Sequence, residues 1–188
     1  IEQSDSEFCI HLGDMVNPVP ELPSYTTAAN NFHAIASRLS IPLYLMPGNH
    51  DIGDKPVTWM PAGMVNKEHV DLYRHHFGRD YFSFDYETCH FVIINSPLIN
   101  SGDPIEKKQA AWLENDLNEN KSKRIFLFSH YPVYVSNPDE PESYDNIDEP
   151  GRSWLINLIE TYKPEALFAA HVHNFWYDVI GETEYYIV

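Results

Sequence analysis

Cysteine, basic residues and long apolar runs are all scarce in this sequence of 188 residues. Its two cysteines, Cys9 and Cys89, lie in apolar stretches without CxxC or Cys/His spacing, so we expect buried free thiols and no disulfide framework. Lys and Arg number 12 against 28 Asp and Glu, and the formal charge of -16 would repel a nucleic-acid backbone. The longest apolar runs fall short of the roughly 18 residues that a membrane span needs, so we expect no such span.

Apolar residues make up 43% of the sequence, which suits a single domain over residues 1–188. Their spacing predicts a helix over about 26–39, whose inner face would carry Ala28, Phe32, Ile35, Ala36 and Leu39. Further helices are predicted near 67–77, 106–119 and 153–162, and strands over 43–46, 81–86, 90–95, 125–128, 166–169, 176–180 and 185–188. Strands that alternate with helices and include a hairpin at 81–95 predict an α/β layered sandwich with mixed sheets.

Four apolar runs end directly in polar residues that bind metals. They are FCIHLGD at 8–14, LYLMPGNHD at 43–51, IFLFSH at 125–130 and ALFAAHVH at 166–173. Each run is typical of a buried strand, and the reactive groups of such sheets gather where strands end. We therefore expect one edge of the sheet to carry Asp14, Asn49, His50, Asp51, His130, His171 and His173.

The types of side chain at this edge indicate metal chemistry. Carboxylate, carboxamide and imidazole together suit a borderline ion such as Mn, Fe, Co, Ni or Zn. Asp14 follows a glycine and has two carboxylate oxygens, so it is the natural bridge between two ions. Asn49 offers a carbonyl oxygen as a ligand, while its amide can still donate to a bound oxyanion. His171 and His173 are two positions apart and can reach one ion or two neighbouring ions.

His50 suits a different role, because the carboxylate of Asp51 follows it directly. A carboxylate that orients an imidazole and raises its basicity is what a proton donor to a leaving group requires. The pair predicts general acid catalysis beside the metal ligands.

Taken together, these motifs resemble those of the calcineurin-like metallophosphoesterases. That family carries Asp-x-His, Gly-Asp, Gly-Asn-His-Asp, a His after a strand, and Gly-His-x-His, in this order. The sequence shows Gly13-Asp14, the complete Gly48-Asn49-His50-Asp51, Ser129-His130 and Ala170-His171-Val172-His173, also in this order. The resemblance spans residues 8–173.

The resemblance implies a layered α-β-β-α sandwich that hydrolyses phosphate esters, as a phosphatase or a phosphodiesterase. It implies two divalent or trivalent transition-metal ions bridged by Asp14, one completed by Asn49, His130 and His171 and the other bound by His173. His50, oriented by Asp51, would protonate the leaving oxygen, and a metal-bound hydroxide would be the nucleophile. The substrate would be a small phosphate ester or a phosphoprotein.

Departures from the family pattern leave a second hypothesis open. No Asp-x-His lies upstream of Asp14, and we expect truncation at the N-terminus in preference to loss of the motif. Ala170 replaces a glycine, Asn17 stands where many members have Asp, and the sequence stops inside a strand-like run, so the C-terminus is also expected to be shortened. The alternative is a binding scaffold that keeps the fold and hydrolyses little. The cytoplasm is slightly favoured as the compartment, while a secreted or periplasmic protein also fits.

Several other residues have a simpler structural interpretation. The segment 136–150 holds six acids and no base, which is typical of a solvated loop, although its place after His130 also suits the rim of a site. Arg152 is interpreted as a surface salt bridge in preference to a phosphate clamp. Packing is the role expected of Trp59, Trp154 and Trp176, and ordinary surface or core positions are expected of His11, His33, His69, His75, His76 and His90.

Overall fold

The computed structural model describes residues 5–56 and 62–188, so Trp59 lies outside the described residues. The helices are α1 (Tyr25–Ala36), α2 (Asn49–Ile52), α3 (Lys67–Phe77), α4 (Pro104–Asn120) and α5 (Gly151–Tyr162), with a short 3-10 helix at Ser96–Leu98. The strands are β1 (Cys9–His11), β2 (Leu43–Leu45), β3 (Phe82–Tyr86), β4 (Cys89–Ile93), β5 (Arg124–Phe128), β6 (Ala166–Ala169), β7 (Trp176–Ile180) and β8 (Thr183–Ile187). Within the described ranges, the helices are too short or too polar to cross a membrane.

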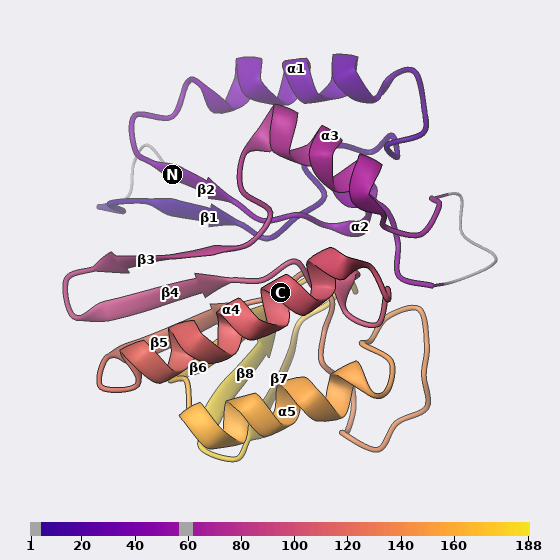
Figure 1. Ribbon diagram of the computed structural model, residues 1–188. Helices are drawn as coiled ribbons and strands as arrows, with labels where there is room; N and C mark the ends of the chain where they lie inside the picture. Colours follow the sequence, from indigo (N-terminus) through magenta and orange to yellow (C-terminus); the bar gives the residue numbers. More distant parts are fainter. Residues whose placement is uncertain (1–4, 57–61) are drawn as a thin grey trace.

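The strands form two sheets that lie between two layers of helices. β1 and β2 pair in parallel, and a six-stranded sheet has the order β3-β4-β5-β6-β8-β7. Figure 1 shows α1 and α3 above the two-stranded sheet, with α4 and α5 on the far side of the six-stranded one. The six-stranded sheet is mixed, because the β3–β4 and β7–β8 pairs are antiparallel and the remaining pairs are parallel. The predicted layered α/β sandwich with a mixed sheet is confirmed.

The prediction of a single sheet edge was wrong, because the four motif-bearing strands divide between the two sheets. β1 and β2 belong to the two-stranded sheet, and β5 and β6 lie side by side in the six-stranded one. Apolar periodicity identifies a strand but not its partner, so the sequence pattern did not reveal this division.

An aromatic layer separates the two sheets. Along β5, Ile125 and Leu127 face the helices, while Phe126 and Phe128 face the two-stranded sheet, as strand alternation requires. The rings of Phe128 and Phe168 stack with centroids 5.3 Å apart, and Phe8, in the segment that leads into β1, packs edge-on against neighbouring rings. This layer fixes the distance between the two sheets and therefore between the polar residues that follow their strands.

The helix α1 begins within one residue of its predicted start but presents a different face. Tyr25 and Ala29 are buried, and Phe32 packs against the same core. Ile35 is 66% exposed, because the register set by Tyr25 makes position 36, not 35, the next inward one. The helix also ends at Ala36, before Leu39.

Both cysteines are free thiols, as predicted, but each is only partly buried. Trp154 packs against the core under α5, as expected of a packing residue, whereas Trp176 is 42% exposed on the edge strand β7. The expectation of packing is therefore wrong for Trp176.

His90 joins the β3–β4 hairpin to α4. Its Nδ1 lies 2.7 Å from the carboxylate of Asp85 on β3, and its Nε2 lies 2.8 Å from that of Asp116 on α4. Ser83 also donates to Asp116, and Lys123 donates to Asp85. Burial lowers the pKa of His90, but its hydrogen bonds and charge interactions with the two carboxylates outweigh burial and raise the pKa above its ordinary value. A protonated His90 donates through both nitrogens.

Candidate metal centre

Side chains from both sheets converge where β1, β2, β5 and β6 end. One ligand atom from each of Asp14, His130 and His171 lies within 4.8 Å of the corresponding atoms of the other two. His130 and His171 are buried, and Asp14 is partly buried. Asn49 is the first residue of α2, and its Oδ1 lies 3.1 Å from Nε2 of His130. The structure therefore brings these four predicted ligands together.

Tight backbone turns make this convergence possible. Asp14 and His171 have φ angles of 56° and 68°, in the left-handed region that side chains other than glycine rarely adopt. Two glycines permit close approach, because a Cβ on Gly13 would lie 2.5 Å from Nδ1 of His130, and one on Gly48 would lie 2.2 Å from Oδ1 of Asp14. Backbone strain of this kind costs about 1–3 kcal/mol per residue and is typical of functional sites.

Hydrogen bonds assign the protonated nitrogen of both imidazoles. Nδ1 of His130 lies 2.7 Å from the carbonyl oxygen of Leu12, so it donates to that oxygen. Nε2 of His171 is buried without a hydrogen-bond partner, while the ring makes a hydrogen bond with the backbone of Tyr144, which leaves Nδ1 as the donor. In both rings Nε2 is therefore an unprotonated acceptor, the arrangement that metal-binding histidines adopt.

Burial keeps both rings neutral. It lowers the pKa of His130 despite the nearby charge of Asp14, and burial together with His130 lowers the pKa of His171 to about 3. Nε2 of His130 then faces two acceptors, Oδ1 of Asn49 at 3.1 Å and Oδ2 of Asp14 at 3.5 Å. Acceptors that face one another without a proton repel, and a cation among them removes the repulsion. The described donor set of two imidazoles, a carboxylate and a carboxamide therefore fits a borderline transition-metal ion.

The amide of Asn49 is fully used by the protein. Its Nδ2 donates to Oδ2 of Asp54 at 3.2 Å and to the hydroxyl oxygen of Tyr144 at 2.8 Å. Asp54 is buried and also accepts hydrogen bonds from the Tyr131 hydroxyl and the Lys55 amide. An amide nitrogen has two protons, so the predicted donation from Asn49 to an oxyanion was wrong. The two bonds instead orient Oδ1 toward the metal ligands.

His50 is oriented by a different group from the one predicted. Its Nδ1 lies 2.6 Å from the carbonyl oxygen of Asn17, and its backbone amide donates to Oδ1 of Asp14 at 3.0 Å. The carboxylate of Asp51 is buried and accepts from the amides of Gly48 at 2.8 Å and Val16 at 3.2 Å. The predicted Asp51–His50 contact was wrong, and Asp51 instead joins the two ligand-bearing turns at residues 13–16 and 48–51.

The acidic segment 136–150 is an ordered rim of the site and not simply a solvated loop. Glu140 accepts from Asn146 at 2.6 Å and from the backbone amides of Val135 and Ser136. Burial opposes ionisation of this carboxyl, but these hydrogen bonds lower its pKa to about 2. Arg152 is 2% exposed and donates to three backbone carbonyls of the loop, those of Ile147, Pro138 and Glu140. It is therefore neither a surface salt bridge nor a phosphate clamp.

Lys55 fastens this loop to the metal centre. Its Nζ donates to the carbonyls of Ser143 and Asn146 and to the carboxylate of Asp148, at 2.5, 2.7 and 2.7 Å. Tyr144, between the first two, reaches Asn49 with its hydroxyl and packs its ring against His171. Sequence reasoning missed both residues, although a charged pair directly after Gly53, Asp54-Lys55, was a signal that the motif continues into a buried network.

His173 is the predicted ligand that stands apart. It is exposed and lies outside the group formed by Asp14, His130 and His171. Its φ of 56° is again left-handed. Within the described ranges, this group is the one cluster of acidic, His or Cys residues spaced for a metal ion, and the six isolated histidines are outside it.

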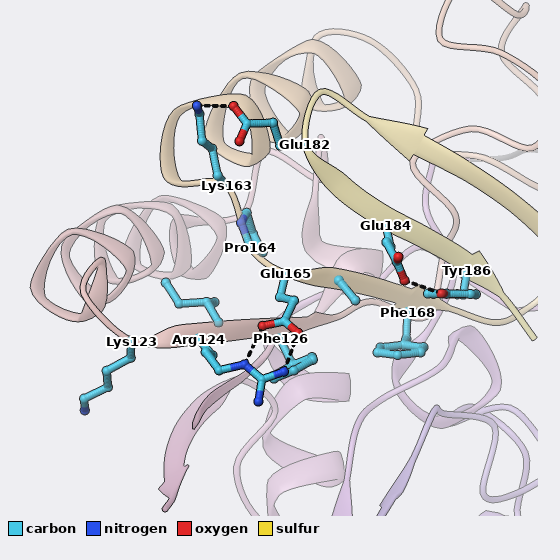
Figure 2. Close-up of a pocket in the computed structure, with 12 residues that line it drawn as sticks. Lys123, Arg124, Phe126, Lys163, Pro164, Glu165, Phe168, Glu182, Glu184 and Tyr186 are labelled. Atoms are coloured by element: carbon cyan, nitrogen blue, oxygen red, sulfur yellow. Dashed lines mark hydrogen bonds and ion pairs between the residues drawn. The ribbon is translucent and has the colours of Figure 1, made fainter. Parts of the chain in front are cut away.

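A hollow of about 730 Å³ lies at the opposite ends of the strands, where β5 and β6 begin (Figure 2). Arg124 pairs with Glu165 through two hydrogen bonds, Lys163 pairs with Glu182, and Tyr186 donates to Glu184. These charges neutralise one another across the hollow and do not converge on a common point, so the metal centre remains the candidate functional site.

Comparison with known proteins agrees with the motifs. The family described as calcineurin-like phosphoesterase matches residues 1–175. The chain is 28% identical over 180 residues to the serine/threonine-protein phosphatase CPPED1 of Danio rerio, covering 92% of this chain and 55% of the relative. It is 25% identical over 178 residues to a probable glycerophosphodiester phosphodiesterase, GpdQ, of Arcobacter nitrofigilis, covering 88% of this chain and 60% of the relative. The chain thus spans little more than half the length of these relatives.

The fold also matches solved structures. Purple acid phosphatase PPD1 from yellow lupin (Lupinus luteus) superposes with a TM-score of 0.64 at 17% identity, covering 98% of this chain and 37% of that one. At this identity the match shows a shared fold.

Proposed function

The chain belongs to the calcineurin-like phosphoesterase family, and we propose that residues 1–188 are a catalytic domain that hydrolyses phosphate esters with the help of metal ions. The observation that carries this proposal is the convergence of Asp14, His130 and His171, with both imidazoles turned so that an unprotonated Nε2 faces the other ligands. The convergence of this nitrogen of His130 with a carboxylate and a carboxamide oxygen is the arrangement that a bound cation would satisfy.

Each ligand has a distinct role in the proposal. Asn49, His130 and His171 would hold one ion, Asp14 would bridge to a second, and His173 would contribute to that second ion. Bound ions of this kind act as Lewis acids and lower the pKa of water to about 7. The chain's own residues contribute orientation, because Asp51 fixes the turns that carry Asp14 and Asn49.

His50 is proposed as the proton donor to the leaving oxygen. The carbonyl oxygen of Asn17 accepts a hydrogen bond from Nδ1, which leaves Nε2 as the nitrogen that would meet the leaving oxygen. The carbonyl therefore takes the orienting role that the sequence had suggested for Asp51.

The proposed substrate is a small phosphate ester or an exposed phosphate on a protein. The acidic rim at 136–150 and the net charge of -16 disfavour nucleic acids. The similar proteins are a serine/threonine-protein phosphatase and a probable phosphodiesterase, which supports both ester classes as candidates.

The test measures metal content and hydrolysis in the same preparation. Purified protein would be dialysed, loaded with Mn²⁺, Zn²⁺ or Fe²⁺, and assayed with nitrophenyl phosphate and bis-nitrophenyl phosphate. We expect bound metal and hydrolysis of at least one ester, both reduced in His130→Ala. Metal binding without hydrolysis of either ester would favour the non-catalytic scaffold, and no metal binding would refute the proposal.

A further inference from the structure

A cavity of about 300 Å³ lies between the N-terminal halves of α4 and α5, and the proposed metal ligands are not part of its lining. Its apolar walls include Ile99, Ala110, Pro150 and Trp154. Pockets that bind small molecules typically combine such walls with a few polar groups. We propose that this cavity binds a small molecule with an aromatic body and one acidic group, which Lys107 on α4 recognises. This inference goes beyond the proposed function and does not depend on it.

The neutral polar groups of the lining are already bonded to the protein. Asn100 accepts from the amide of Gly151 at 3.0 Å and donates to the carbonyl oxygen of Asp148 at 2.7 Å. Gln109 accepts from the backbone amide of Asn95 at 2.7 Å and donates to its carbonyl oxygen at 3.0 Å. A polar ligand body would lose its hydrogen bonds to water and gain few in return, so the body that fits here is apolar.

The two charged residues of the lining, Glu106 and Lys107, differ in how their charges are used. The Glu106 carboxylate accepts from the amides of Asn100 at 2.6 Å and Gly102 at 2.7 Å. Lys107 is exposed, and within residues 5–56 and 62–188 its ammonium has neither an ion pair nor a hydrogen bond. The ammonium is therefore the charge that a ligand can pair with, and it selects an acidic group at the edge of an apolar body.

The walls of the cavity are fixed before a ligand arrives. A Cβ on Gly151 would lie 2.1 Å from Cγ2 of Ile99, so the glycine allows the start of α5 to pack directly on this wall. Trp154 packs against the core, and its Nε1 donates to Glu114 on α4 at 3.3 Å, which ties the indole to both helices. Fixed walls with an indole suit a rigid aromatic body, because a flexible one would lose conformational freedom on binding.

The test uses naphthoate as the acidic aromatic probe and follows the indole N–H signals of isotopically labelled protein by NMR. The signal of Trp154, assigned with Trp154→Phe, should shift with a Kd of about 1 mM or tighter. The signal of Trp176 on β7 should move little. The neutral analogue naphthamide should bind about three- to five-fold more weakly, because it cannot pair with the Lys107 ammonium.

Two pairs of neighbouring residues on α4 provide matched variants, because one member of each pair lines the cavity and the other does not. Lys107→Met should remove the preference for naphthoate over naphthamide, whereas Lys108→Met should retain it. Ala110→Leu fills the cavity and should weaken binding of both probes by about 10-fold or more. Ala111→Leu should leave both affinities unchanged.

The opposite results overturn the inference. A Trp154 signal that does not shift at about 10 mM naphthoate excludes the cavity as a site for this class of ligand. Equal affinities of wild type for naphthoate and naphthamide remove the recognition of the acidic group by Lys107. Similar shifts of the Trp154 and Trp176 signals that persist in Ala110→Leu would show non-specific association, which also overturns the proposed site.

Discussion

Replacing Lys55 by methionine should lower the free energy of unfolding by about 3 kcal/mol. The ammonium is 4% exposed and donates to three oxygens, whereas Asp148, its ionic partner, is 21% exposed. Removing one partner of a buried ion pair costs about 3–5 kcal/mol, and water that reaches Asp148 places the cost at the lower end. Methionine keeps the length and packing of the side chain, so the loss reports the charge and its hydrogen bonds.

Urea unfolding monitored by tryptophan fluorescence measures this cost, and the chain provides a matched control. Lys67 on α3 pairs with Asp71, but these side chains are 72% and 53% exposed, so Lys67→Met should cost under about 0.5 kcal/mol. In a double-mutant cycle, Lys55→Met and Asp148→Asn together should be less destabilising than the sum of the single variants, by about 1–2 kcal/mol. Equal costs for the two lysine variants would refute the role of Lys55 as the fastener of the rim loop.

Three further predictions concern histidines. His50→Ala should retain its Mn²⁺ but hydrolyse alkyl phosphates about 10²- to 10⁴-fold more slowly, with smaller losses for nitrophenyl esters that need no proton; equal losses would exclude the acid role. His171→Ala should weaken Mn²⁺ binding in calorimetry more than His173→Ala, because His173 is exposed and outside the cluster, and the reverse order would contradict the assignment. His90 has a folded-state pKa above its unfolded value, so its stabilisation is complete below about pH 6.5 and is lost as pH rises through the raised pKa. In urea unfolding, the free energy of unfolding of wild type should therefore be larger than that of His90→Gln by about 2 kcal/mol at pH 5.5 and by less at pH 9. A difference that does not change with pH would contradict the assignment of this stabilisation to protonated His90.

Local sequence features predicted most of the helices and strands, and they picked out polar side chains that the fold brings together. Apolar runs bounded by Gly and Pro located β2, β5 and β6, and the residues after them met in space. This worked because strand ends and glycine turns are properties of a few neighbouring residues, which a sequence shows directly.

Contacts between distant segments were the part that sequence could not supply. Asn49 and Tyr144 are 95 positions apart, and they meet only because the rim loop folds around Glu140 and Arg152. Adjacency in sequence was misleading for Asp51, which follows His50 but uses its carboxylate to cap the N-terminus of its own helix, α2. Charge composition likewise suggested a solvated loop, whereas the backbone amides of Val135 and Ser136 bind the carboxylate of Glu140 and Lys55 pairs with that of Asp148.

The origin of the ligands in two separate sheets has a consequence for cooperativity. Asp14 and Asn49 follow strands of the small sheet, whereas His130 and His171 follow strands of the large one. An ion shared among them would act as a reversible cross-link between two parts of the chain, in addition to the aromatic layer and the hydrogen bonds of Lys55 that already join them. Binding stabilises only those states in which all its ligands are assembled, so metal occupancy would raise the cost of separating the sheets more than that of opening either one alone. Without metal, each sheet would then open locally and independently of the other, whereas with metal bound the two sheets would open together.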